Sequence, residues 1–95
     1  MSEADFKKAL NYVTHGPKAS LSDKQRLALY ALFKQITIGP CKEPQPSKLR
    51  FVARAKHDAW KKLGSLSKTK AIEQYIATIE TFAPRWRSWK MKSKL

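Results

Sequence analysis

The 95-residue sequence lacks several features that would each point to a class of protein. It has one cysteine and two histidines, so an internal disulfide and a structural zinc site are both excluded. Its longest unbroken apolar run, residues 27–33, is far shorter than the roughly 20 residues that a membrane-spanning helix needs. The first five residues carry two acids and no apolar stretch, which argues against a secretory signal and predicts an intracellular protein.

Acidic residues are also scarce, at 7 against 20 basic ones, which gives a formal charge of +13. The excess is uneven, because residues 85–95 hold five bases and no acid. The sequence nevertheless contains 42% hydrophobic residues, too many for a disordered basic chain and enough for one packed core. We therefore expect one small domain over residues 1–84 and a separate basic tail over residues 85–95.

Two helices are predicted in the first half of the chain. Residues 2–14 have an apolar stripe at helical spacing, and Gly16-Pro17 ends the helix. A capping box over residues 22–25 starts the second helix, which runs over 23–38 and stops at Gly39-Pro40.

Two further helices are predicted after an extended, proline-containing loop over residues 41–47. The third helix starts at Lys48 and is closed by Gly64, a residue suited to a left-handed cap. Its apolar stripe is formed by Val52, Ala55, Ala59, Trp60 and Leu63. The fourth helix opens at Ser67 and continues until Pro84. Four helices without a strand signal predict an all-α bundle.

Polar and aromatic side chains share one face of the second helix. Tyr30, Phe33 and Lys34 are three and four residues apart, so two rings and a cation project together. Lys56 lies at the edge of the apolar stripe on the third helix. Because phosphates are held best by several convergent cations and hydroxyl donors, these residues and Tyr75 are candidates for binding one. From spacing alone, the favoured interpretation is that Tyr30 and Phe33 are core residues and Lys34 is solvated, because most apolar stripes belong to a core.

Three ordered motifs in these helices resemble the acyl-CoA-binding protein family. Residues 30–39 fit the pattern YxLxKQxTxG, residues 55–60 contain AKxDAW with His57 inside the motif, and Tyr75-Ile76 follows. The resemblance covers about residues 6–82. It implies an up-down-down-up four-helix bundle, with a surface bowl for the coenzyme A head group and an apolar groove for the acyl chain.

Matched position by position, the resemblance assigns a ligand-binding role to five residues. It places Tyr30, Lys34 and Lys56 at the 3′-phosphate and adenine, Tyr75 against the nucleotide, and Phe33 in the wall. Four departures from the family pattern predict fewer head-group contacts. Phe33 lacks the hydroxyl of the usual tyrosine, His57 replaces a tryptophan, and Thr14 and Val52 stand where many members carry a basic residue.

No catalytic chemistry is predicted. His15 and His57 lie in different elements, and Cys41, in a loop after Gly39-Pro40, is interpreted as a structural or incidental thiol. Without a nucleophile–base pair or paired carboxylates, we expect a protein that is not an enzyme and has no cofactor. Its ligand is then a long-chain acyl-CoA.

The tail beyond Pro84 has three alternative interpretations. Its two tryptophans and five cations fit an anionic membrane surface, or the tryptophans pack back on the bundle. The sequence also ends in Ser93-Lys94-Leu95, a peroxisomal address when it stands at a free C-terminus. We expect a peroxisome or related microbody, with the cytoplasm as the alternative.

The combined expectation is a monomeric carrier that delivers long-chain fatty acyl-CoA to the enzymes that use it. Its other predicted partner is the peroxisomal import receptor. We expect the protein to bind no nucleic acid and to contact membranes at most transiently. Two rival interpretations rest on the high charge and on the departures from the family. They are a basic nucleic-acid-binding helical domain and a membrane-surface interaction module whose ligand pocket has decayed.

Overall fold

The structure is a computed structural model that describes residues 2–17 and 20–90. Within these residues the chain forms four α-helices and a short 3-10 helix, with no strand. The helices are α1 (Glu3–His15), α2 (Asp23–Thr37), α3 (Phe51–Lys62) and α4 (Lys68–Phe82), followed by the 3-10 helix η1 (Trp86–Ser88). The predicted all-α class is confirmed.

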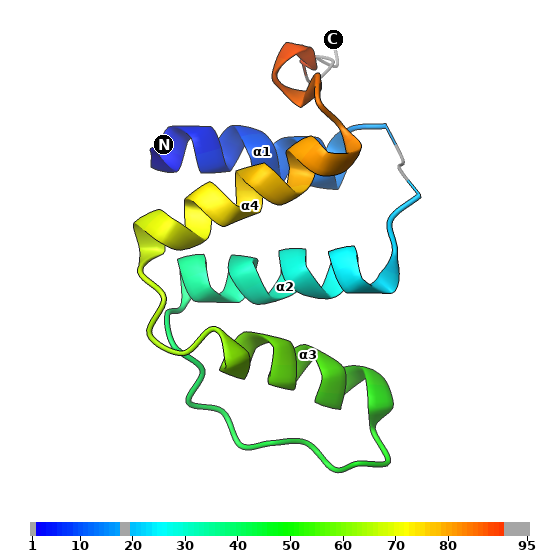
Figure 1. Ribbon diagram of the computed structural model, residues 1–95, viewed down its shortest axis with the longest axis vertical. Helices are drawn as coiled ribbons and strands as arrows, with labels where there is room; N and C mark the ends of the chain where they lie inside the picture. The colour runs from blue at the N-terminus through cyan, green and yellow to red at the C-terminus, as the bar shows by residue number, and fades with distance from the viewer. Residues whose placement is uncertain (1, 18–19, 91–95) are drawn as a thin grey trace, which may run out of the picture.

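The helices follow the up-down-down-up order that the resemblance implied. In Figure 1, α1 and α4 run in one direction, and α2 and α3 run in the other. Helix α2 packs against α4 on one side and against α3 on the other, and α1 packs against α4. The two parallel helices α2 and α3 separate towards their N-terminal ends (Figure 1). This divergence leaves room between them where the candidate site residues lie.

Helix ends follow the predicted signals closely. Capping boxes at Ser2 and at Ser22 start α1 and α2, and the Ser67 hydroxyl accepts from the Lys70 amide at the start of α4. These bonds satisfy amides that a helix leaves without an intrahelical partner. Gly64 has a φ of 58°, the left-handed conformation expected after α3.

The start of α3 corrects the prediction from the sequence. The helix begins at Phe51, not at Lys48, because a turn precedes it in which the Arg50 amide donates to the Ser47 carbonyl at 3.0 Å. Val52 was expected on the buried stripe, yet 68% of its surface is exposed. The first turn of α3 diverges from α2. A residue on the side of this turn that faces α2 therefore has no neighbouring helix to pack against, and helical periodicity alone does not predict its burial.

The main hydrophobic core lies between α1, α2 and α4. Ala9, Ala71, Ile76 and Ile79 have no exposed surface in this core. Phe6 packs edge-on against Tyr75, with ring centroids 5.2 Å apart. The three helices are therefore joined by one continuous apolar cluster.

A smaller cluster joins α3 to α2. Trp60 is 1% exposed and packs with Ala31 and Cys41, and its indole N–H donates to the Gly39 carbonyl at 2.9 Å. The buried Gln35 amide donates to the carbonyls of Gly64 and Leu66, which ties the turn after α3 to α2. The C-terminal half of α3 is thus fixed, while its first turn stays exposed.

The chain beyond Pro84 packs back on the bundle as far as it is described. Trp86 is 1% exposed within the main core, and Trp89 meets Tyr12 of α1 edge-on at 5.7 Å between ring centroids. Among the three interpretations of the tail, this agrees with packing of the tryptophans on the helices. The predicted targeting residues Ser93-Lys94-Leu95 lie outside the described residues. No helix in the described ranges is both long and apolar enough to cross a bilayer.

Candidate functional site

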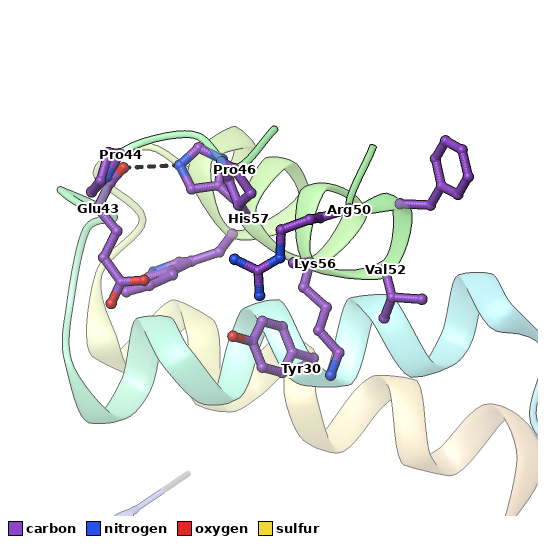
Figure 2. A pocket seen from close by; sticks show the side chains of 11 residues that line it. Tyr30, Glu43, Pro44, Pro46, Arg50, Val52, Lys56 and His57 are labelled. Carbon is purple, nitrogen blue, oxygen red and sulfur yellow. Dashed lines mark hydrogen bonds between the residues drawn. The ribbon is translucent and has the colours of Figure 1, made fainter. Parts of the chain in front are cut away.

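A hollow of about 640 Å³ opens between α2, the first turns of α3 and the loop that joins them. Its volume lies within the roughly 300–1,000 Å³ typical of small-molecule sites. Figure 2 shows Tyr30 on α2 and Lys56 on α3 reaching towards each other across this space, with the Arg50 guanidinium above them. The lining residues are Tyr30, Glu43, Pro44, Pro46, Arg50, Phe51, Val52, Ala53, Lys56, His57 and Trp60.

Two lysines and two aromatic rings form the polar part of this site. The Lys56 ammonium lies 5.1 Å from the centroid of the Tyr30 ring, and the Lys34 ammonium lies 5.9 Å from the same ring. Lys34 also lies 5.2 Å from the Trp60 ring. Cations at this distance from an aromatic face are attracted by its quadrupole. Two positive charges therefore lie against the same tyrosine ring, an arrangement suited to a phosphate or pyrophosphate group.

A second hollow, of about 390 Å³, continues from the first between the N-terminal halves of α2 and α3. It shares Tyr30, Phe51, Val52 and Lys56 with its neighbour and adds the apolar walls Leu27 and Ala55. Asp23 and Arg26 lie at its edge. The two hollows together offer a cationic region next to an apolar one, as a ligand with an anionic head and a hydrocarbon chain requires.

Hydrogen bonds from α3 hold the loop that forms one wall. The buried His57 ring bonds to the Glu43 carbonyl through Nε2 at 2.9 Å (Figure 2). Its Nδ1 bonds to the Asp58 carboxylate at 3.0 Å. Asp58 also accepts from Gln45 and from Arg54. The Asp58 carboxylate, and secondly the Glu43 carbonyl, raise the pKa of His57, since both ring N–H groups then have acceptors. His57, which departs from the family pattern, therefore serves to position the loop.

Of the basic residues near Lys56, only Arg50 faces the hollow. Arg50 lines it, whereas the Arg54 guanidinium is engaged with Asp58 at 3.2 Å and with the Pro46 carbonyl. Within the described residues, no carboxylate lies within ion-pair distance of Arg50. Arg50 can therefore supply a third cation, although Glu43 on the opposite wall is a negative charge that a bound anion must avoid or displace.

The structure separates the five predicted ligand-binding residues into two groups. Tyr30 and Lys56 line the hollow, and Lys34 lies next to it, against the rings of Tyr30 and Trp60. Phe33 and Tyr75 lie with Phe6 between α1, α2 and α4, where the centroid of the Phe33 ring is 6.5 Å from that of Phe6. Burial raises the pKa of Tyr75 to about 12, so its hydroxyl stays protonated at neutral pH. The roles assigned to Phe33 and Tyr75 remain predictions.

The two positions that lack the basic residue of many family members differ in their surroundings. Val52 lines both hollows, so its methyl groups extend the apolar wall where a cation would otherwise stand. Thr14 lies on α1, where its hydroxyl donates to the Leu10 carbonyl at 2.8 Å, and it lines a separate hollow near the end of that helix.

Sequence reasoning missed several lining residues. Glu43, Pro44 and Pro46 belong to the loop, whose path depends on the bonds made by His57 and Asp58. Trp60 was interpreted as core alone, but its ring also faces Lys34. Arg50, Arg54 and Lys18 were weighed from the sequence as substitutes for the missing basic residues and interpreted as ordinary solvated charges, whereas Arg50 lines the hollow.

Comparison with known proteins identifies one family. Residues 3–79 match the family described as Acyl CoA binding protein. Among curated relatives, "Acyl-CoA-binding domain-containing protein 1" of Arabidopsis thaliana is 46% identical over 66 residues, which is 70% of this chain and 20% of that protein. "Acyl-CoA-binding domain-containing protein 4" of Oryza sativa subsp. japonica is 43% identical over 67 residues, again 70% and 20%. The chain thus spans about a fifth of the length of these relatives.

Solved structures agree with the sequence matches. The solution structure of the acyl CoA binding protein from Babesia bovis T2Bo superimposes with a TM-score of 0.81 at 35% identity, covering 93% of this chain and all of the other (100%). The crystal structure of ACBP from Moniliophthora perniciosa gives a TM-score of 0.82 at 31% identity, covering 93% of this chain and 86% of the other. The fold is therefore shared over nearly the whole chain.

Proposed function

Because the chain belongs to the acyl-CoA-binding protein family, we propose that it binds one long-chain fatty acyl-CoA and carries it to the enzymes that use it. The observation that carries this proposal is the convergence of Lys34 and Lys56 on Tyr30 beside a hollow with a continuous apolar extension. A coenzyme A ester has both parts that such a site selects, namely a phosphorylated nucleotide and a hydrocarbon chain.

The polar part of the site is suited to the phosphates of the head group. A hydrogen bond to an ionised group is roughly twice as strong as a neutral one, and several cations around one hollow also attract an anion from a distance. We place the phosphates at Lys34 and Lys56, with Arg50 as a further donor in place of the basic residues missing at Thr14 and Val52.

The apolar part is suited to the acyl chain. We place the chain along Leu27, Val52 and Ala55 in the smaller hollow. Each methylene removed from water contributes about 0.8 kcal/mol, so the chain favours the ester over free coenzyme A. Tight binding needs both the polar and the apolar part of the site, because neither coenzyme A nor the fatty acid alone would contact both.

The proposed role is binding without catalysis. The thioester would lie between phosphate-binding lysines and an apolar wall. Carriage by a monomer, with acyl-CoA-using enzymes as recipients, is the simplest role for such a site.

Isothermal titration calorimetry with palmitoyl-CoA, free coenzyme A and palmitate tests this proposal, with the ester kept below its micelle-forming concentration. We expect one-to-one binding that is tight for the ester, weaker for coenzyme A and weakest for palmitate. Added salt should weaken the contribution of the coenzyme A head group to the affinity, whereas the increase in affinity with acyl chain length should persist. Absence of binding to all three would contradict the proposal and support one of the rival interpretations, and tight binding of nucleic acid with a steep salt dependence would favour the nucleic-acid one.

The place of action in the cell is a separate proposal. The sequence Ser93-Lys94-Leu95 supports import into a peroxisome or related microbody by its receptor. A fluorescent protein fused to the N-terminus, leaving these residues at the end of the chain, should collect in these organelles. The same fusion without the three residues should stay in the cytoplasm, and an unchanged distribution would contradict the proposal.

A further inference from the structure

Exposed apolar residues are concentrated at one corner of the molecule. Leu49 is 85% exposed, Phe51 78% and Val52 68%, and they lie within four consecutive residues where the loop enters α3. The other large exposed apolar side chains in the described part of the chain, Ile38 at 60% and Val13 at 38%, stand apart from it in sequence. Single exposed apolar residues are ordinary, but a contiguous group marks a contact surface.

Cations alternate with these apolar residues. Lys48 and Arg50 flank Leu49, and both are exposed. Among the described residues, neither cation has a carboxylate within ion-pair distance, and residues 47–57 contain no acid at all. The acids that line the two hollows are Asp23, on α2, and Glu43, on the loop. We name residues 48–52 the basic–apolar corner.

We propose that the basic–apolar corner docks the protein on an anionic lipid bilayer. Exposed aromatic and aliphatic side chains enter the boundary between head groups and acyl chains, while neighbouring lysines and arginines contact anionic head groups. The alternation of the two kinds of side chain over residues 48–52 provides both interactions in one short segment. An acidic protein partner would satisfy the cations, but it would need a complementary apolar pocket for the protruding Leu49 and Phe51.

The position of this corner connects it to the ligand site. Phe51 and Val52 belong both to the corner and to the walls of the two hollows. Docking would therefore bring the opening of the apolar hollow to the membrane surface, where an acyl chain could pass from bilayer to groove with little exposure to water. This consequence rests on the proposed acyl-CoA binding, whereas the docking itself does not.

Co-sedimentation of the full chain with phosphatidylcholine vesicles, with and without phosphatidylserine, tests the docking. Because a net charge of +13 attracts the whole protein to any anionic surface, the decisive comparison uses variants of equal charge. The test variant is Leu49→Ser with Phe51→Ser, and the matched control is Ile38→Ser, which removes an exposed apolar side chain elsewhere. Circular dichroism verifies that both variants are folded.

We expect binding to the phosphatidylserine vesicles at near-physiological salt, lowered about tenfold or more in the double variant by the loss of two inserting side chains. The Ile38→Ser control should stay within about twofold of the original protein, the small change usual for an exposed side chain. Binding to neither kind of vesicle, or equal loss in test and control variants, would overturn the proposal. Calorimetry with palmitoyl-CoA is read separately, so failure of docking and failure of ligand binding are distinguishable.

Discussion

The two sides of α2 are built differently. Towards α1 and α4 it contributes to a continuous core that includes residues with no exposed surface and extends to Trp86. Towards α3 it meets a small cluster around Trp60 and then two hollows bordered by lysines and exposed apolar residues. Tight packing stabilises a fold, whereas a binding site needs surface that the fold leaves uncovered. The contrast therefore predicts that stability and ligand affinity can be altered separately.

The largest effect is expected from removing Trp86 from the packed side. Trp86→Ala should lower the free energy of unfolding by about 3–5 kcal/mol, the usual cost of deleting a buried aromatic ring. Urea denaturation followed by circular dichroism measures the change. The neighbouring Arg85→Ala, at an exposed position, should alter stability by less than about 0.5 kcal/mol. A similar small change for Trp86→Ala would show that the chain beyond Pro84 is not part of the core.

The reverse result is expected on the open side. Lys34→Ala and Lys56→Ala should each weaken head-group binding by about 1.5–3 kcal/mol, the scale of a hydrogen bond to a charged group, and leave the unfolding midpoint nearly unchanged. Calorimetry with coenzyme A and with palmitoyl-CoA gives the affinities. Lys61→Ala is the matched control for Lys56→Ala, because Lys61 is an exposed lysine on the same helix, α3, that lines neither hollow and does not lie over the Tyr30 ring. Unchanged affinity in both test variants would contradict the site assignment.

Phe33 provides a test at the boundary between the two sides. It is half-buried against the main core, yet the family resemblance places it in the ligand wall. If the head group reaches it, Phe33→Tyr should restore a hydroxyl donor and tighten coenzyme A binding by about 1 kcal/mol, as one hydrogen bond contributes. The calorimetric titration of coenzyme A checks this. No gain in affinity, with unchanged stability, would assign Phe33 to the core alone.

The smallest effect is expected from the pH dependence of the loop. The raised pKa of His57 means that its contribution to stability is complete below the ordinary histidine value near 6.5 and is lost as pH rises through the folded value. The urea midpoint should therefore fall as the pH rises above about 6.5 and passes through the raised pKa of His57. His57→Gln, which keeps a polar side chain but does not titrate, should flatten this part of the profile. An equal slope in both proteins would show that His57 stays neutral in the fold.

Local signals in the sequence were sufficient for most helix boundaries. The capping boxes at Ser2 and Ser22 and the cap at Ser67 use residues within three positions of each other, so they form whatever the rest of the chain does. The start of α3 was predicted wrongly, because Arg50 offers no side-chain cap and a turn at Ser47 competes with the helix. Where no local bond defines a boundary, packing does.

The candidate site was predicted only in part, because only some of its residues are related by local spacing along the chain. Tyr30 and Lys34 share a helical face at a spacing that the sequence specifies, and Lys56 stands at the edge of the next helix's apolar stripe and within a family motif. The bonds that hold the loop, from His57 to Glu43 and from Asp58 to Gln45, join residues more than ten positions apart. Spacing carries no information on such pairs, so the wall formed by the loop could not be foreseen.

The sequence by itself determined an all-α chain with four amphipathic helices, a strong positive charge and a motif set typical of acyl-CoA binding. Helical periodicity, capping and motif identity are local properties, and they need no knowledge of which helix meets which. Only the tertiary structure decided that α3 separates from α2 at its N-terminal end. That divergence leaves Leu49, Phe51 and Val52 exposed and opens the hollows, because burial depends on the distance between helices and not on the pattern along one of them.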